Sequence, residues 1–223
     1  MAFFREDSEK VHGAHAALNS GAEAIVERKV DDLETTPSGI PGMDDLQWGS
    51  HICQWYFKRR DLAGTLVPYF EAGLKNNERC IWVTAAPYEA ADARYDLEGA
   101  VAGLEQMIAD KQLSIFDASN WYGTSLSGVN LVQQWLVEER EALAAGYKGV
   151  RIAANNSFVS EVDWQIFMEY ENALNREMLQ KHRMVALCSY NVLDVKPKKM
   201  LQAVHSHQVT IQQAGPVWKP LEI

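Results

Sequence analysis

The sequence predicts an α/β fold with a mainly parallel central sheet and helices on both faces. Short apolar runs alternate with amphipathic helical segments over most of the chain after residue 50. This alternation is typical of parallel strands joined by helices, because such strands are buried on both faces. The length of 223 residues, with 47% hydrophobic and 23% charged residues, suits one large globular domain with an appendage.

The expected elements follow a turn-rich boundary. Residues 36–42 (TPSGIPG) separate an N-terminal helical appendage and linker, residues 1–37, from a core domain, residues 38–223. Apolar runs predict strands at 51–56, 79–84, 113–117, 149–154, 184–190 and 209–214, the last in an edge hairpin with 217–218. Helical spacing predicts helices at 62–75, 88–111, 126–146, 160–181 and 197–205, with Pro197 at the first position of the last one.

The appendage contains one narrow apolar seam. Val11, Leu18 and Ile25 recur every seven residues, which indicates a helix that pairs along one stripe. Two interpretations stay open: a solvated leader, or a helix that binds a partner or a second copy. Because the seam suits pairing, we expect a homo-oligomer to which residues before Pro37 contribute.

Composition excludes several partner classes. A net charge of −9 repels a phosphate backbone, so we expect no direct binding of nucleic acid. No apolar run approaches the ~20 residues of a membrane span, and residues 1–10 lack the apolar core of a secretion signal. We therefore expect a cytoplasmic protein that does not bind a membrane.

Aromatic and amide side chains follow the expected strands, at the edge where open α/β sheets bind ligands. Catalytic metal or ATP chemistry would need carboxylates there, and only Asp117 is well placed. No nucleophile elbow, zinc-protease motif or cofactor fingerprint occurs, so we expect no catalytic residue and no cofactor. The candidate ligand-binding residues are Tyr56, Phe57, Lys58, Arg59, Trp121, Tyr122, Asn155, Asn156, Trp164, Ser189 and Tyr190.

The three cysteines lie in expected strands without the paired spacing of a zinc site. His51 and Cys53 share one face of their strand. One interpretation places the strand of Cys188 alongside it, so that these three residues form a metal-binding cluster. The other is that both thiols pack as small hydrophobes. We favour the second, because no carboxylate partner is evident, and we expect no metal.

Residues 38–87 resemble the opening of the RecA/KaiC-type ATPase domain: a glycine-rich lead-in, a strand, a loop, a helix and a second strand. The loop at 56–61 reads YFKRRD, whereas that family's phosphate loop is G-x-x-x-x-G-K-[ST]. Ala85-Ala86 and Asn155-Asn156 stand where the family has a water-orienting acid and a magnesium-binding Asp. The resemblance implies a P-loop-like fold without functional Walker motifs.

Several segments in order extend this likeness to a narrower family. They are residues 48–56 (WGSHICQWY), 66–74 (LVPYFEAGL), 80–84 (CIWVT), 145–151 (AGYKGVR), 170–171 (YE) and 187–190 (LCSY). Together they resemble the MEDS domain, the methanogen/methylotroph, DcmR-type sensory domain, over about residues 38–191. The resemblance implies a domain without ATPase machinery that senses simple hydrocarbon derivatives and is usually fused to a histidine kinase or a DNA-binding module. Neither module is evident here, so output would pass through a partner, the N-terminal helix or an undetected activity.

The sequence therefore predicts a non-catalytic sensory or regulatory domain that binds a small organic ligand at the carboxyl end of the sheet. It would signal through a protein partner, such as a kinase or a transcription regulator, or through its own oligomer. One alternative is an interaction module that assembles through RecA-like surfaces without a ligand. Another is a cryptic enzyme or nucleotide binder. The aromatic and amide mixture at the strand ends favours the ligand-binding interpretation, since a pure scaffold has no need of it.

Overall fold

A seven-stranded sheet forms the centre of the computed structural model, which describes residues 34–123, 128–178 and 181–221. In spatial order its strands are β5 (Leu113–Asp117), β4 (Arg79–Thr84), β6 (Val150–Asn155), β7 (Met184–Asn191), β3 (His51–Tyr56), β8 (Val209–Ala214) and β9 (Val217–Pro220). Every neighbouring pair is parallel except β8 with β9. The predicted mainly parallel sheet is confirmed.

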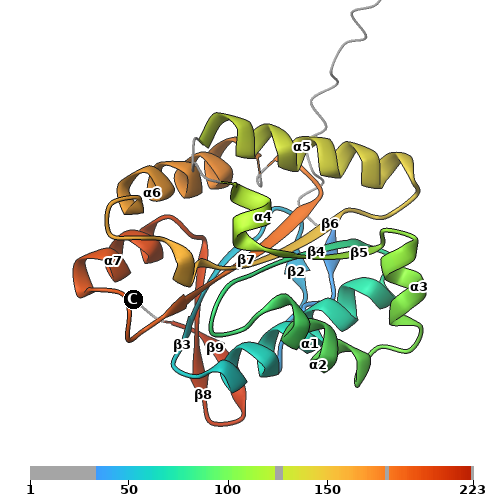
Figure 1. Cartoon of the computed structure of the whole chain (residues 1–223), viewed down its shortest axis with the longest axis horizontal. Helices are drawn as coiled ribbons and strands as arrows, with labels where there is room; N and C mark the ends of the chain where they lie inside the picture. Colours follow the sequence, from blue (N-terminus) through green and yellow to red (C-terminus); the bar gives the residue numbers. More distant parts are fainter. Residues whose placement is uncertain (1–33, 124–127, 179–180, 222–223) are drawn as a thin grey trace, which may run out of the picture.

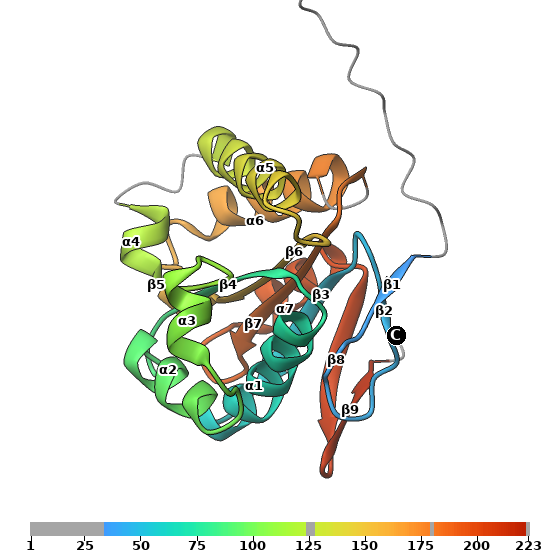
Figure 2. The same cartoon turned by 90° about the vertical axis from the view of Figure 1, so that its right-hand side faces the viewer.

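Helices cover both faces of the sheet (Figures 1 and 2). The helices α1 (Arg59–Lys75), α2 (Ala90–Glu98) and α3 (Leu104–Ala109) pack on one face, and α4 (Ala118–Tyr122), α5 (Gly128–Ala144), α6 (Trp164–Ala173) and α7 (Pro197–His205) pack on the other. Successive residues of a strand point to opposite faces. In β3, Cys53 and Trp55 accordingly join the core under α4–α7, whereas Ile52 and Tyr56 join the core under α1–α3.

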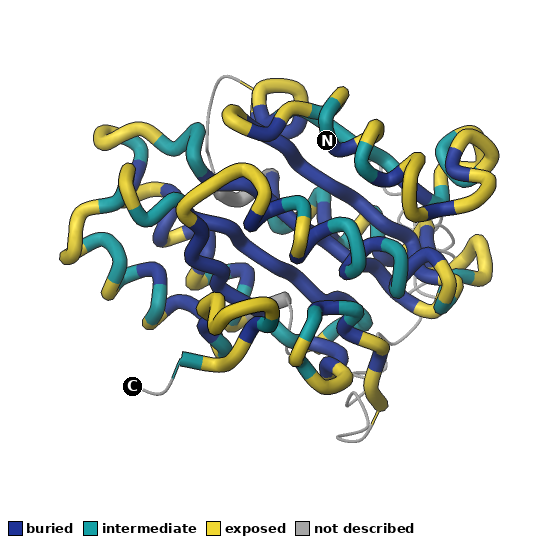
Figure 3. The backbone as a smooth tube through the Cα atoms, turned by 90° about the horizontal axis from the view of Figure 1, so that it is seen from below, coloured by how far each residue is buried: buried dark blue, intermediate teal, exposed yellow. Residues whose placement is uncertain are grey.

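The central strands are buried along their length, while the outer turns of the helices are exposed (Figure 3). β3, β4 and β6 are buried at every residue. This pattern explains why their sequences read as continuous runs without alternation. No described helix combines the length and the apolar character that crossing a bilayer requires.

Helix boundaries differ from the sequence prediction. The expected helix 88–111 is two helices, α2 and α3, because Gly99 and Gly103 interrupt it and Gly103 adopts a positive φ of 76° that favours glycine. The expected helix 160–181 ends as α6 at Ala173 and continues as a π-helical turn, Leu174–Met178. The short helix α4 and the 3₁₀ turn Asn156–Phe158 were not predicted.

The described chain begins with a segment that is bound to the core. β1 (Thr35–Thr36) pairs antiparallel with β2 (Leu46–Gln47). The loop between them contacts β9, where the Trp218 backbone N–H donates to the Pro41 carbonyl over 2.7 Å. The predicted N-terminal seam at Val11, Leu18 and Ile25 lies outside the described residues.

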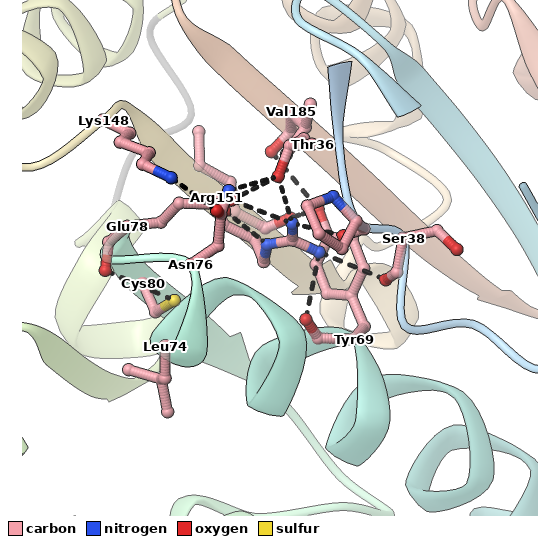
Figure 4. A network of polar contacts seen from close by, with 12 residues as sticks. Thr36, Ser38, Tyr69, Leu74, Asn76, Glu78, Cys80, Lys148, Arg151 and Val185 are labelled. Carbon is pink, nitrogen blue, oxygen red and sulfur yellow. Dashed lines mark hydrogen bonds and ion pairs between the residues drawn. The ribbon is translucent and has the colours of Figure 1, made fainter. Parts of the chain in front are cut away.

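A buried ion pair anchors this segment at the end of the sheet where β6 begins (Figure 4). Arg151 Nε lies 2.6 Å from Glu78 Oε2, and both side chains are completely buried. The same guanidinium donates to the Pro37 carbonyl over 2.7 Å and to Thr36 Oγ1 over 2.9 Å. A side chain at Gly73 would collide with Arg151, which explains a glycine inside α1.

Candidate functional site

In the loop between β3 and α1, backbone N–H groups bind a carboxylate of the chain itself. Asp61 lies in the first turn of α1 and is buried, and its Oδ2 accepts hydrogen bonds from the backbone N–H of Phe57 (3.1 Å) and of Lys58 (2.9 Å). In a phosphate-binding loop such N–H groups face the ligand's phosphate. Here a carboxylate of the chain satisfies them.

The basic residues of this loop do not gather at the strand ends. Lys58 is exposed. Arg59 pairs with Asp92 of α2, with Nη2 and Oδ1 2.8 Å apart, and its guanidinium lies 5.3 Å from the centre of the Tyr88 ring. The guanidinium of Arg59, which the sequence placed in the ligand site, is therefore directed toward α2.

Several candidate residues tie strand ends together inside the core. Tyr56 donates from its hydroxyl to Asn155 Oδ1 over 3.1 Å, and Asn155 Nδ2 donates to the Ala85 carbonyl over 2.7 Å. Ser189 Oγ donates to Gln54 Oε1 over 2.7 Å. These contacts satisfy buried polar groups that would otherwise cost free energy, so each has a structural role.

Trp121 and Tyr122 of α4 pack against the helices on the same face. The ring centre of Trp121 lies 4.4 Å from that of Trp135 in α5, and that of Tyr122 lies 4.9 Å from that of Phe158. Both residues are buried. These two candidates belong to the apolar core under α4–α7, Trp121 against α5 and Tyr122 against the turn at Phe158.

Three candidates line one small cavity beyond β6 and β7. Asn156, Trp164 and Tyr190 contribute to its wall, and its volume is about 90 Å³. The Asn156 amide lies beside the Tyr190 hydroxyl, and both groups are buried. At this volume the cavity admits only a very small molecule.

A larger cavity of about 620 Å³ lies between the ends of β3 and β7, helix α7 and the β8–β9 hairpin. Its lining residues are Trp55, Phe57, Val192, Pro197, Met200, Leu201, Val204, Gln212, Gln213 and Leu221. Eight of these ten are apolar and none is charged, so the cavity suits an uncharged organic molecule. Of the candidates from the sequence, Phe57 alone lines it.

A separate cluster lies buried between the sheet and α6. Glu171 Oε2 is 3.2 Å from His51 Nε2 and 3.3 Å from His207 Nε2. Cys188 Sγ is 3.5 Å from His51 Nε2 and 3.7 Å from Glu171 Oε1. The expectation that no carboxylate accompanies His51 and Cys188 is wrong, because α6 carries Glu171 over this part of the sheet.

Burial controls the protonation of this cluster. It lowers the pKa of His51 to about 4, with the neighbouring His207 acting in the same direction. Burial alone would raise the pKa of Glu171, but its contacts with His207 and His51 outweigh burial and hold the pKa at about 2. Burial and the charge of Glu171 raise the pKa of the Cys188 thiol. At neutral pH the cluster thus contains a neutral His51, an ionised Glu171 and an un-ionised thiol.

The model of one protein family, MEDS, described as the methanogen/methylotroph, DcmR sensory domain, matches residues 50–208. The chain belongs to the MEDS family. The matched region contains the buried cluster and every candidate ligand-binding residue. Leu221, Gln212 and Gln213, which complete the large cavity, lie beyond the MEDS match.

One curated relative of the chain is a transcriptional repressor. The transcriptional repressor DcmR of Methylorubrum extorquens strain DM4 is 26% identical over 173 residues, which cover 77% of this chain. The aligned region is 62% of the repressor's own length, so this MEDS chain matches less than two thirds of that protein.

Solved structures confirm the RecA-like fold of this MEDS protein. A KaiC-like protein from Pyrococcus horikoshii OT3 superposes with a TM-score of 0.54 and 14% identity, covering 84% of this chain and 86% of that one. The flagellar accessory protein FlaH from Methanocaldococcus jannaschii gives 0.50 and 14%, covering 81% and 77%. At this identity the likeness shows the fold alone.

The sequence analysis missed most of the large cavity, although α7 carried a signal for it. Pro197, Met200, Leu201 and Val204 have the spacing i, i+3, i+4, i+7, which places them on one face of a helix. Leu201 is 59% exposed and Phe57 57% exposed, so this apolar face is not fully covered by the fold. An apolar helix face without a packing partner is the pattern that could have indicated the cavity.

Proposed function

We propose that this MEDS-family protein is a non-catalytic sensory domain that binds a small, uncharged organic molecule in the cavity beside α7. The observation that carries the proposal is the lining: eight apolar side chains, two glutamines and no charge around about 620 Å³. Cavities of roughly 300–1,000 Å³ with few polar groups are the usual form of small-molecule sites. A hydrocarbon derivative with one polar group fits this chemistry, since Gln212, on the α7 face of β8, supplies an amide donor and acceptor.

The cavity also offers a route for a signal. One of its walls is α7, and another is the β8–β9 hairpin at the edge of the sheet. A ligand that binds better to one position of these elements than to another would shift their population. The change in α7 and the hairpin would then be sensed by a partner protein or by a second copy of this chain. Because the relative DcmR is named a transcriptional repressor, a transcription regulator is the favoured partner.

Filling the cavity is expected to abolish ligand binding. Val204→Trp adds a large ring to the cavity wall at the last turn of α7, and we expect at least a tenfold loss of affinity, because an occupied volume excludes the ligand. Ligand-observed NMR with a graded series of primary alcohols and alkyl halides measures binding to the wild-type protein and to the variant.

Val137→Trp is the matched control, since Val137 lies on the exposed face of α5, outside the cavity lining. Equal binding by wild type and Val204→Trp would place the ligand elsewhere. If no compound of the series binds the wild type, while a partner protein protects α7 from hydrogen exchange, the interaction-module alternative replaces the proposal.

ATP is expected not to bind. A nucleotide phosphate would have to displace the Asp61 carboxylate from the N–H groups of Phe57 and Lys58, with no glycine in the loop to reshape it. Titration calorimetry with ATP and magnesium should show no heat of binding. Micromolar affinity with turnover would establish the cryptic-enzyme alternative instead.

Asp61→Ala tests whether removing the carboxylate from the loop is enough to allow ATP to bind. Removing this cap should lower the free energy of unfolding by about 0.5–2 kcal/mol. It should not create ATP binding, because the glycines, the lysine and the acids of a working site are still missing.

A further inference from the structure

We propose that His51, Glu171, Cys188 and His207 form a tetrahedral binding site for a divalent transition metal, with Zn²⁺ the preferred ion. Each residue offers one ligand atom, and all four atoms lie within 4.8 Å of one another. The four side chains are buried and come from four elements: β3, α6, β7 and the turn between α7 and β8. The proposal is independent of the ligand cavity beside α7.

Three of the six distances between the ligand atoms match the edges of a tetrahedron around zinc, and the others are no longer than 4.8 Å. With Zn–N and Zn–O bonds of about 2.0–2.2 Å and a Zn–S bond of about 2.3 Å, the edges between ligand atoms are roughly 3.3–3.7 Å. The contacts from Glu171 Oε2 to the two histidine Nε2 atoms are 3.2 and 3.3 Å, and the contact from Cys188 Sγ to His51 Nε2 is 3.5 Å. The sulfur lies 3.7 Å from the other oxygen, Glu171 Oε1.

The tautomer of His207 directs a lone pair into this centre. Its Nδ1 lies 2.6 Å from the carbonyl oxygen of Ala203, which can only accept, so Nδ1 carries the hydrogen. Nε2 of the neutral ring is then a bare acceptor facing Glu171 Oε2. Neither atom makes a well-aligned hydrogen bond among the described residues, and Oε2 also lies 3.2 Å from His51 Nε2. Two buried acceptors that face each other need a proton or a metal ion between them, and a backbone carbonyl on Nδ1 is the usual support of a metal-binding histidine.

The donor set selects the class of metal. Two imidazoles, a thiol and a carboxylate suit zinc or another late transition metal, whereas magnesium and calcium prefer oxygen ligands. Four protein ligands leave no open position, which is typical of structural rather than catalytic zinc. Coordination forms four metal–ligand bonds and releases the Cys188 proton to solvent. This proposal replaces our sequence-based expectation that the cysteine is inert.

The competing arrangement has no metal and a proton on His207 Nε2, shared with Glu171. Cobalt substitution separates the two. The full chain is unfolded, refolded with Co²⁺ to bypass slow entry into a buried site, and desalted. We expect one ion per chain, a thiolate-to-cobalt charge-transfer band and visible bands of tetrahedral intensity, all lost on displacement by Zn²⁺.

Substitutions locate the ion. Cys188→Ala and His207→Ala should weaken Zn²⁺ binding by more than about 100-fold, beyond the loss usual for outer-shell changes. Cys80→Ala is the control, because Cys80 is an equally buried thiol on the opposite face of the sheet. Cys53→Ala should also keep the metal, since Cys53 is not one of the four ligands.

Wild-type protein that retains no Zn²⁺ and shows no cobalt–thiolate band would overturn the proposal, and this measurement does not depend on any variant folding. Metal retained equally by the wild type, Cys188→Ala and His207→Ala would overturn it as well. Metal that is lost with Cys188 and His207 but kept with Cys80 supports it.

Discussion

Glu78→Ala is expected to lower the free energy of unfolding by about 3–5 kcal/mol, because it leaves the Arg151 guanidinium buried without its counter-charge. Arg151 is fully buried, and Glu78 is the carboxylate that contacts it, with Nε and Oε2 2.6 Å apart. A loss of this size is a large part of the 5–15 kcal/mol that typically stabilises a domain. Urea denaturation followed by circular dichroism measures it.

Glu71→Ala provides the matched control. Glu71 also forms an ion pair, with Lys75 one turn along α1, but this pair lies at the surface. Its loss should cost no more than about 0.5 kcal/mol. Equal losses for the two variants would show that burial of the Arg151–Glu78 pair has no energetic consequence.

Glu78→Ala should also release the segment around Thr36 from the core. The Arg151 guanidinium donates to the Thr36 hydroxyl and to the Pro37 carbonyl, so its position holds β1 against the core. Limited proteolysis of Glu78→Ala under native conditions should cleave near Pro37 faster than in Glu71→Ala.

Trp135→Ala is expected to cost about 3–5 kcal/mol, the usual range for removing a buried tryptophan. Trp135 lies in α5 and is 1% exposed. Its ring packs against Trp121, and its indole N–H donates to the Tyr170 hydroxyl over 2.7 Å. The substitution therefore opens a cavity and removes a buried hydrogen bond together.

Trp135→Phe narrows the comparison, because it keeps one aromatic ring of the apolar volume while it removes the donor. We expect a loss of about 1–3 kcal/mol for this variant. Val137→Ala, on the exposed face of the same helix, should stay within about 0.5 kcal/mol of wild type. A Trp135→Ala loss as small as that of Val137→Ala would contradict the packing of α5 described here.

Most of the sheet could be predicted from the sequence. The strands at 51–56, 79–84 and 113–117 have the bounds expected from their apolar runs. The first two are buried at every residue, and a strand buried on both faces gives a local and continuous signal. Helix ends were harder. The break between α2 and α3 depends on the conformation of Gly103, and short helices such as α4 carry too few residues to show a period.

The ligand site could be predicted only in part. The rule that ligands bind beyond the carboxyl ends of strands led to Phe57, which lines the large cavity. The same rule also selected Tyr56, Asn155 and Ser189, whose polar groups are satisfied inside the core. A position after a strand does not reveal whether a side chain turns toward the core or toward a cavity, because that depends on which helix packs above it.

The sequence by itself determined most of the strands, the glycine-free loop at Phe57 and the common face of His51 and Cys53, because each depends on the order and spacing of neighbouring residues. The tertiary structure alone decided that Glu171 and His207 join His51 and Cys188, and that the α7 face meets the β8–β9 hairpin around a cavity. Each of these sites unites residues from separate elements. Their distances follow from how helices pack on the sheet, and no local pattern along the chain contains that information.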